Sequence, residues 1–233
     1  RLYLHRFFHY EKTLALQISK LCSNNDIDGR KLRLQAQKDL INHILFPPNV
    51  SLTTTDWQQV ACLNVFFNIF NIISGGPGTG KTTTVSKLLV LLLMDNPDCK
   101  VSLCAPTGKA AARMQESISN AMVSLKDLDI PEDIIHKISI LQATTIHSLL
   151  GYIHGSIAFR HNNNNLLKTD VLIVDECSMI DLSLFYKLLQ AVDTTSTKVI
   201  LLGDKNQLAS VDAGSIFRDL CNETMEMNTF SSE

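Results

Sequence analysis

Short apolar runs alternate with longer stretches of helical spacing over most of this 233-residue chain. Continuous apolar runs are typical of buried parallel strands, and the longer stretches carry the periodicity of helices packed on one side. Strands are expected at residues 71–74, 100–105, 170–174 and 198–202, and helices from Asp56 and at residues 82–94, 109–125 and 182–191. The alternation predicts an α/β fold, a parallel sheet flanked by helices.

The first part of the chain follows a different pattern, that of a small helical region. Three apolar residues there have helical spacing, Leu14, Ile18 and Leu21. Residues 32–45 predict a further helix, which Pro47 and Pro48 would end. We therefore expect a helical N-terminal region at 1–54, a candidate for docking a partner, and the sheet-forming domain at 55–233.

The segment GGPGTGKT, from Gly75 to Thr82, fits the phosphate-binding pattern G-x-x-x-x-G-K-[ST] in full. It lies between an expected strand and an expected helix, an order that a chance glycine-rich turn would not have. Its backbone N–H groups and the start of the helix would face phosphate oxygens, Lys81 would reach the β- and γ-phosphates, and Thr82 would ligate Mg²⁺. The residues expected to bind nucleotide here are Gly75, Gly76, Pro77, Gly78, Thr79, Gly80, Lys81, Thr82 and Thr83.

Two further strand ends carry candidate chemistry. Asp175 and Glu176 follow the apolar run at 171–174, where Asp175 would hold Mg²⁺ through water and Glu176 would polarise the attacking water. A solvated loop start is the alternative, but it would not explain the pairing with a phosphate loop. Gln207 follows the strand expected at 198–202 and could contact the γ-phosphate, although a Gly-Asp turn alone explains this segment equally well.

Composition and charge exclude only a few classes of protein. The net charge of −2 does not indicate a nucleic-acid binder, so any DNA contact must rest on local sites. Six cysteines include no CxxC pair and complete no zinc set, which favours free thiols in a reducing cytoplasm. No run of 18 apolar residues is present, so we expect no membrane span. The start at Arg1 and the polar stretch at 222–233 suggest a fragment of a longer protein.

Four segments together resemble the motifs of one helicase family. They are SGGPGTGKTTTV (74–85), APTGKAAARM (105–114), IVDECSMIDL (173–182) and LGDKNQLASVDAG (202–214). They are similar to motifs I, Ia, II and III of the RecD family of superfamily 1 DNA helicases. TTIHSLLG (144–151) resembles the short motif between Ia and II, and Gln58 resembles the glutamine that reads adenine ahead of the phosphate loop.

The resemblance implies a RecA-like P-loop domain, with ATP and Mg²⁺ as cofactors and Lys81, Glu176 and Gln207 as catalytic residues. It implies a DNA contact through Pro106, Thr107, Lys109, Thr145 and His147. A backbone N–H, a hydroxyl and an ammonium at a helix start suit a phosphate contact. Cys177 departs from the family's usual alanine, a small residue in both cases.

Several neighbouring residues allow more than one interpretation. Arg113 lies one helical turn beyond Lys109, where a phosphate contact and a surface salt bridge are equally open. Tyr152 and Phe159 are candidates for stacking on bases, but core packing is the simpler expectation for both. His147 likewise suits packing as well as DNA.

The resemblance implies a 5′→3′ DNA helicase subunit of the exodeoxyribonuclease V complex, acting in double-strand break repair with RecB- and RecC-like subunits. Motifs IV to VI of a second motor domain are not found in the sequence, so a nucleotide- and partner-binding fragment without motor activity is the alternative. A small-molecule kinase is disfavoured by Glu176 and by the motifs at 105–114 and 202–214. No nuclease site is found in the sequence.

Overall fold

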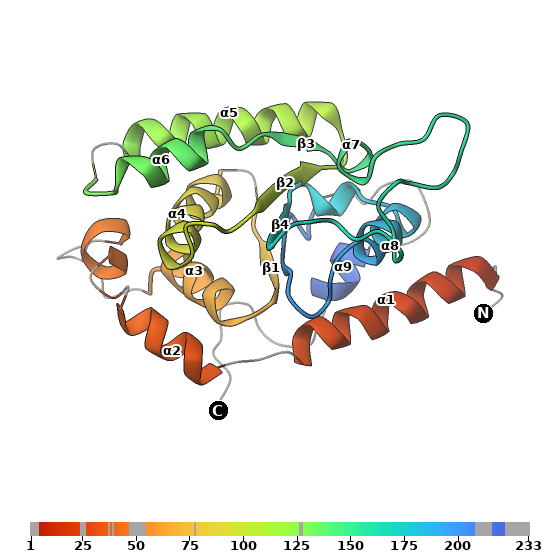
Figure 1. Ribbon diagram of the computed structural model, residues 1–233, viewed down its shortest axis with the longest axis horizontal. Coiled ribbons are helices and arrows are strands. Elements are labelled where there is room, and N and C mark those ends of the chain that lie inside the picture. Colours follow the sequence, from red (N-terminus) through yellow and green to blue (C-terminus); the bar gives the residue numbers. More distant parts are fainter. Residues whose placement is uncertain are drawn as a thin grey trace.

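The fold is an α/β fold built on one parallel sheet, as predicted. The computed structural model describes residues 5–23, 27–36, 38, 40–46, 55–76, 78–125, 128–207 and 216–221. In these ranges five strands form a sheet with the order β1-β5-β4-β2-β3, and every neighbouring pair is parallel (Figure 1). The strands are β1 (Phe70–Ser74), β2 (Val101–Ala105), β3 (Ala143–Thr145), β4 (Val171–Val174) and β5 (Lys198–Gly203).

Helices cover both faces of the sheet (Figure 1). One core cluster joins the sheet to α3 (Trp57–Phe67), α4 (Lys81–Asp95), α5 (Gly108–Leu125) and α6 (Glu132–Ser139). The other cluster joins the sheet to the helices of the opposite face, which are α1 (His5–Ser23), α7 (Ile146–Leu150), α8 (Leu182–Gln190) and α9 (Ile216–Cys221).

Strand β4 shows how one short sequence serves both faces. Val171 and Ile173 belong to the cluster on the α4 side, whereas Leu172 and Val174 belong to the cluster on the α8 side. All four side chains are buried, because successive residues of a strand point to opposite faces and helices cover both. This double burial explains the uninterrupted apolar run in the sequence.

Helix α4 lies between α3 and α5 and is apolar on almost every side. Its six residues from Leu88 to Leu93 are all buried. Full burial of such a side chain contributes about 1.5–3 kcal/mol of transfer free energy, so this helix anchors the phosphate loop that precedes it.

The N-terminal region packs into both core clusters. Leu14 and Leu21 of α1 enter the cluster on the α8 side, while Ile41 and Leu45 enter the cluster on the α4 side. The single helix expected over residues 32–45 is wrong, because α2 (Ile27–Ala36) ends early and a π-helix, η1, spans Leu40–Leu45. Residues 47–54, where we expect the domain boundary, lie outside the described residues.

The parallel arrangement brings the carboxyl ends of all five strands to one edge of the sheet. The phosphate loop follows β1, and β5 separates it from β4, which Asp175 follows. The segments that follow β2 and β3 occupy the other half of the same edge. Ligand sites in sheets of this kind lie outside these strand ends, so this edge is where a functional site is expected.

Candidate nucleotide-binding site

The phosphate loop turns sharply between β1 and α4. Gly78 and Gly80 have positive φ angles of 75° and 81°, a region that side chains with a Cβ rarely adopt. The hydroxyl of Thr79 donates to the carbonyl of Gly76 at 2.8 Å and closes the loop. Helix α4 begins at Lys81, one residue before the start expected from the sequence, while Pro77 lies outside the described residues.

The ammonium of Lys81 is held by the loop itself. Its Nζ donates to the carbonyl of Gly75 and, at 3.2 Å, to the carbonyl of Gly76. A methyl group on Gly75 would lie 2.6 Å from Oγ1 of Thr79, so a side chain there would displace the hydroxyl that closes the loop. The loop thus holds a cation at the place where phosphate charge is expected.

Asp175 and Glu176 form a short, strained turn after β4. The backbone N–H of Asp175 donates to the carbonyl of Cys104 on β2 at 2.9 Å, and Oδ1 of Asp175 accepts from the N–H of Glu176 at 2.8 Å. Glu176 has a φ of 53° and is the non-glycine residue with positive φ in the described ranges. Such left-handed geometry is costly and is concentrated at functional sites.

The electrostatic surroundings of the two acids differ. Burial raises the pKa of the Asp175 carboxyl, while the Glu176 N–H and the charge of Lys81 act against this rise. Burial also raises the pKa of Glu176, and the charge of Asp175 adds to the rise. Lys81 and Arg113 lower the pKa of Glu176. Both cations therefore act on the carboxylate that we expect to face the attacking water.

A cavity of about 380 Å³ joins the loop to the two acids. Its lining residues are Gly76, Gly78, Thr79, Gly80, Lys81, Thr82, Thr83, Val85, Arg113, Met114, Ser117, Ile118, Asp175, Glu176 and Leu202. Most of the expected phosphate, metal and water-activating residues thus share one space. Gly75, Gln58 and Gln207 are not among the lining residues.

Gln58 lies beside the phosphate loop nevertheless. Asp56 caps α3 by accepting from the N–H groups of Gln58 and Gln59 at 2.9 and 3.3 Å. A methyl group on Gly80 would lie 2.3 Å from Nε2 of Gln58, so the amide is placed against the loop at the start of α4.

The side chain of Gln207 is engaged elsewhere. Its Oε1 accepts a 2.7 Å hydrogen bond from the hydroxyl of Ser178, in the short helix η2 (Cys177–Met179) that follows Glu176. The structure therefore brings Gln207 next to the turn that bears the acids, without placing it in the cavity.

The residues expected to contact DNA lie at the other half of the sheet edge. Ala105 and Thr145 are paired across β2 and β3, which brings Pro106 and Thr107 close to the start of α7. Both threonine hydroxyls act as helix caps: Oγ1 of Thr107 accepts from Ala110 N at 3.2 Å, and Oγ1 of Thr145 accepts from Ser148 N at 3.1 Å. Lys109 is exposed beside them.

The aromatic residues that follow α7 correct one expectation. Tyr152 is 57% exposed, so core packing is wrong for this residue. Phe159 is partly buried against the cluster on the α8 side, with the ring of His147 at 5.6 Å and Nζ of Lys187 at 5.3 Å from its ring centroid. His147 therefore combines an exposed position with packing against Phe159.

Sequence patterns missed the part of the cavity formed by α5. Arg113 and Ser117 line the cavity although neither belongs to the phosphate loop or follows a buried strand. The sequence leaves a DNA phosphate contact and a surface salt bridge equally open for Arg113, and within the described ranges it makes no ion pair. The sequence does show that Arg113 and Ser117 are four residues apart on an expected helix. Residues with this spacing share a helix face, so both side chains could be expected to face the same neighbour.

The cavity offers the donors that Mg²⁺ prefers. The hydroxyl of Thr82 and the carboxyl of Asp175 both line it, and oxygen ligands of this kind suit a small, hard cation. In the described ranges no group of three or more His, Cys, Asp or Glu side chains could hold a metal by itself. The residues present therefore fit a metal that is held jointly with a bound phosphate chain.

Five cysteines are free thiols: Cys62, Cys99, Cys104, Cys177 and Cys221. Cys177 is buried, with its Sγ 3.2 Å from the carbonyl of Val174. Across the described part of the chain, none of the helices has the length and apolar character needed to cross a bilayer.

Comparison with known proteins agrees with this geometry. Residues 58–213 match a family described as an AAA domain. The chain belongs to this family. It is 48% identical over 169 residues to the RecBCD enzyme subunit RecD of Haemophilus influenzae, covering 71% of this chain and 26% of that protein.

Two other relatives extend the match. The RecBCD enzyme subunit RecD of Buchnera aphidicola subsp. Acyrthosiphon pisum is 35% identical, covering 100% of this chain and 36% of that protein. The ATP-dependent RecD2 DNA helicase of Deinococcus radiodurans is 41% identical, covering 92% of this chain and 25% of that protein. The resemblance to RecD proteins is confirmed, and the chain spans between a quarter and two fifths of the length of these relatives.

Proposed function

We propose that this chain is the ATP-binding part of a DNA helicase of the RecD kind, which moves 5′→3′ along single-stranded DNA. It would act in double-strand break repair and recombination, together with RecB- and RecC-like subunits. The observation that carries the proposal is the single cavity in which Lys81 and Thr82 face Asp175 and Glu176. The names of the relatives, RecD and RecD2 DNA helicase, supply the class of motor.

In this proposal the phosphate loop binds the triphosphate of ATP. The N–H groups at the start of α4 have no partner within the helix and receive phosphate oxygens, as the start of any helix can. Lys81 leaves the carbonyls of Gly75 and Gly76 to neutralise charge on the β- and γ-phosphates. Gln58, placed against Gly80, reads the adenine.

Glu176 accepts a proton from the attacking water, and the strained turn directs its carboxylate into the cavity. Thr82 and Asp175 hold Mg²⁺, which when bound offsets negative charge on the phosphates. Gln207 contacts the γ-phosphate after Ser178 releases it, so that the turn after β5 responds to the state of the nucleotide.

The edge formed by β2 and β3 is proposed to bind the DNA backbone. Pro106, Thr107 and Lys109 would contact phosphate from the start of α5, and Thr145 and His147 would contact it from the start of α7. The hydroxyls of Thr107 and Thr145 accept hydrogen bonds as helix caps, so the proton of each hydroxyl remains available to donate to a phosphate oxygen. Contacts to phosphate position a strand without reading its sequence.

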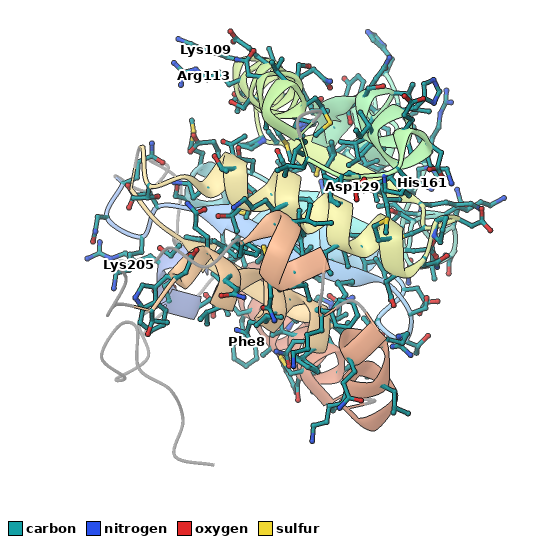
Figure 2. The ribbon with its side chains drawn as sticks, turned by 90° about the vertical axis from the view of Figure 1, so that its left-hand side faces the viewer. Phe8, Lys109, Arg113, Asp129, His161 and Lys205 are labelled. Carbon is teal, nitrogen blue, oxygen red and sulfur yellow. The ribbon has the colours of Figure 1, made fainter. Side chains whose placement is uncertain are left out.

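The helical region before residue 55 is proposed to dock a partner subunit. Helix α1 packs against α8 and leaves two large apolar side chains on its surface, Phe8 (55% exposed; Figure 2) and Leu16 (57% exposed). Exposed apolar residues on one helix are typical of surfaces that another protein covers.

A second candidate function is a nucleotide- and partner-binding chain without motor activity. It would apply to a chain of these 233 residues taken alone, in which motifs IV to VI are not found. Arginines from a second domain contribute about 10³–10⁵ in rate to phosphoryl transfer where they act. The isolated chain would then bind ATP and show little DNA-stimulated hydrolysis and no unwinding.

The test is Lys81→Ala in the full-length protein with its partner subunits. ATP turnover is expected to fall by about 10²–10³-fold, the range seen when a preorganised charge is removed, with the fold intact by circular dichroism. Turnover near that of the unsubstituted protein would exclude the proposed site. Strand displacement by the isolated 233-residue chain distinguishes the two candidate functions, since only a complete motor unwinds DNA.

A further inference from the structure

The cavity contains a second cation that the phosphate-loop motif does not include. Arg113 lies on α5 and lines the same cavity as the loop that carries Lys81. Lys81 donates to two loop carbonyls, whereas the Arg113 guanidinium makes no ion pair or hydrogen bond with any described residue. An exposed guanidinium with five donors remains available to an anion in the cavity.

The position of Arg113 along the cavity is set by its neighbours. Arg113 and Glu176, the acid expected to face the attacking water, both line the cavity. Gln58, which is placed against Gly80 beside the loop, is not among the lining residues. Arg113 therefore shares the cavity with Glu176 and with the phosphate loop, whereas Gln58 does not line it.

Helix α5 connects this end of the cavity to the expected DNA edge. Lys109, Arg113 and Ser117 recur every four residues and so share one face of the helix. Arg113 and Ser117 line the cavity, while Lys109 lies one turn closer to the start of α5 and to β2. Figure 2 shows Lys109 and Arg113 projecting in the same direction from one end of α5.

We propose that Arg113 binds the γ-phosphate of ATP from within this domain and so distinguishes the triphosphate from the diphosphate. The inference rests on the proposed function and deepens it. A guanidinium can bind a terminal phosphate with two parallel hydrogen bonds, which the ammonium of a lysine cannot reproduce. Since α5 also carries Lys109, a strand bound at the start of α5 and a nucleotide bound in the cavity contact one rigid helix.

The experiment measures nucleotide affinity in the full-length protein. Dissociation constants for ADP and for a non-hydrolysable ATP analogue, each with Mg²⁺, are compared for Arg113→Gln, Arg113→Lys and Lys81→Ala. Lys137→Gln is the control, because it removes one positive charge on the half-buried Lys137 of α6, outside the lining of the cavity. Circular dichroism and thermal unfolding report the fold of each variant.

Arg113→Gln is expected to raise the dissociation constant of the triphosphate analogue by about 10-fold or more, as for loss of a hydrogen bond to a charged group. The dissociation constant of ADP is expected to stay within about 2-fold of its original value. Arg113→Lys is expected to restore only part of the difference, and Lys137→Gln to change neither constant. Equal weakening of both nucleotides, or loss of DNA affinity with an unchanged ratio, would overturn the assignment. If Lys81→Ala also leaves nucleotide binding and turnover unchanged, the proposed function fails; if only the Arg113 variants do so, the failure is confined to this inference.

Discussion

The hydroxyl of Ser178 donates a 2.7 Å hydrogen bond to Oε1 of Gln207 and so links the turn after β4 to the turn after β5. Ser178 is buried, whereas Gln207 is exposed. Ser178→Ala is expected to lower the free energy of unfolding by about 0.5–1.5 kcal/mol, the usual net contribution of one such bond. Urea unfolding measures this change through a shift of the midpoint at constant slope.

Ser139→Ala is the matched control for this bond. The Ser139 hydroxyl also donates at 2.7 Å, to the carbonyl of His136, but on an exposed helix end, where substitutions usually change stability by less than about 0.5 kcal/mol. Equal midpoints for the two variants would mean that the link between the turns contributes nothing to stability.

Gly80→Ala tests the contact between the phosphate loop and the expected adenine reader. Alanine at a positive φ costs about 1–2 kcal/mol of folding free energy, and its methyl group would also displace the Gln58 amide. Gly80→Ala is therefore expected to lose preference for ATP over GTP, measured as the ratio of their dissociation constants.

Gly78→Ala is the control for backbone strain. Gly78 has a similar φ of 75°, but a methyl group there meets nothing within 4 Å. Gly78→Ala should be destabilised by a similar amount and keep its preference for ATP. A loss of preference in both variants would show that loop strain, and not Gln58, controls the choice of base.

Glu176→Gln and Glu176→Gly separate the chemistry of this residue from its strain. Both are expected to slow ATP hydrolysis by at least about 100-fold, because neither has a general base. Glycine accepts the φ of 53° without penalty, so Glu176→Gly is expected to be more stable than Glu176→Gln by about 1 kcal/mol. Thermal unfolding without nucleotide gives the comparison, and a less stable glycine variant would contradict it.

Asp175→Asn tests the division of roles between the two acids. We expect it to weaken Mg²⁺-dependent nucleotide binding, whereas Glu176→Gln should bind ATP with Mg²⁺ normally. Titration of nucleotide with and without Mg²⁺ measures both. The same binding defect in the two variants would mean that the acids share one role.

The sheet and the phosphate loop were predictable because their signals are contiguous in the chain. The four residues of β4 are buried on both faces, which forces an unbroken apolar run. Strand β3 left no such signal: its sequence is Ala-Thr-Thr, all half-buried, and pairing with β2 makes it a strand. Helix η1 was misassigned for a related reason, since local spacing cannot distinguish a π-helix from an α-helix.

The site was predictable only in part, because some of its residues come together only through packing between distant segments. Lys81, Thr82, Asp175 and Glu176 belong to short motifs whose chemistry depends on adjacent residues. The presence of Arg113 in the cavity and the bond from Ser178 to Gln207 depend on how α5 and η2 pack against the sheet. The exposure of Tyr152 likewise depends on where its loop leaves the core.

The strand order has a consequence for how the domain folds. Among the described strands β1 pairs with β5 alone, which is the last of them to be synthesised, and the N–H of Gly75 donates to the carbonyl of Gly203 at 3.0 Å. The loop that starts the nucleotide site therefore stays without its neighbouring strand until Gly203 has been synthesised. Such non-local pairing slows folding, because a long loop must close before its contacts stabilise the chain. A nascent chain that ends before Lys198 lacks this partner for β1. The nucleotide site is therefore expected to assemble after the other described strands have paired.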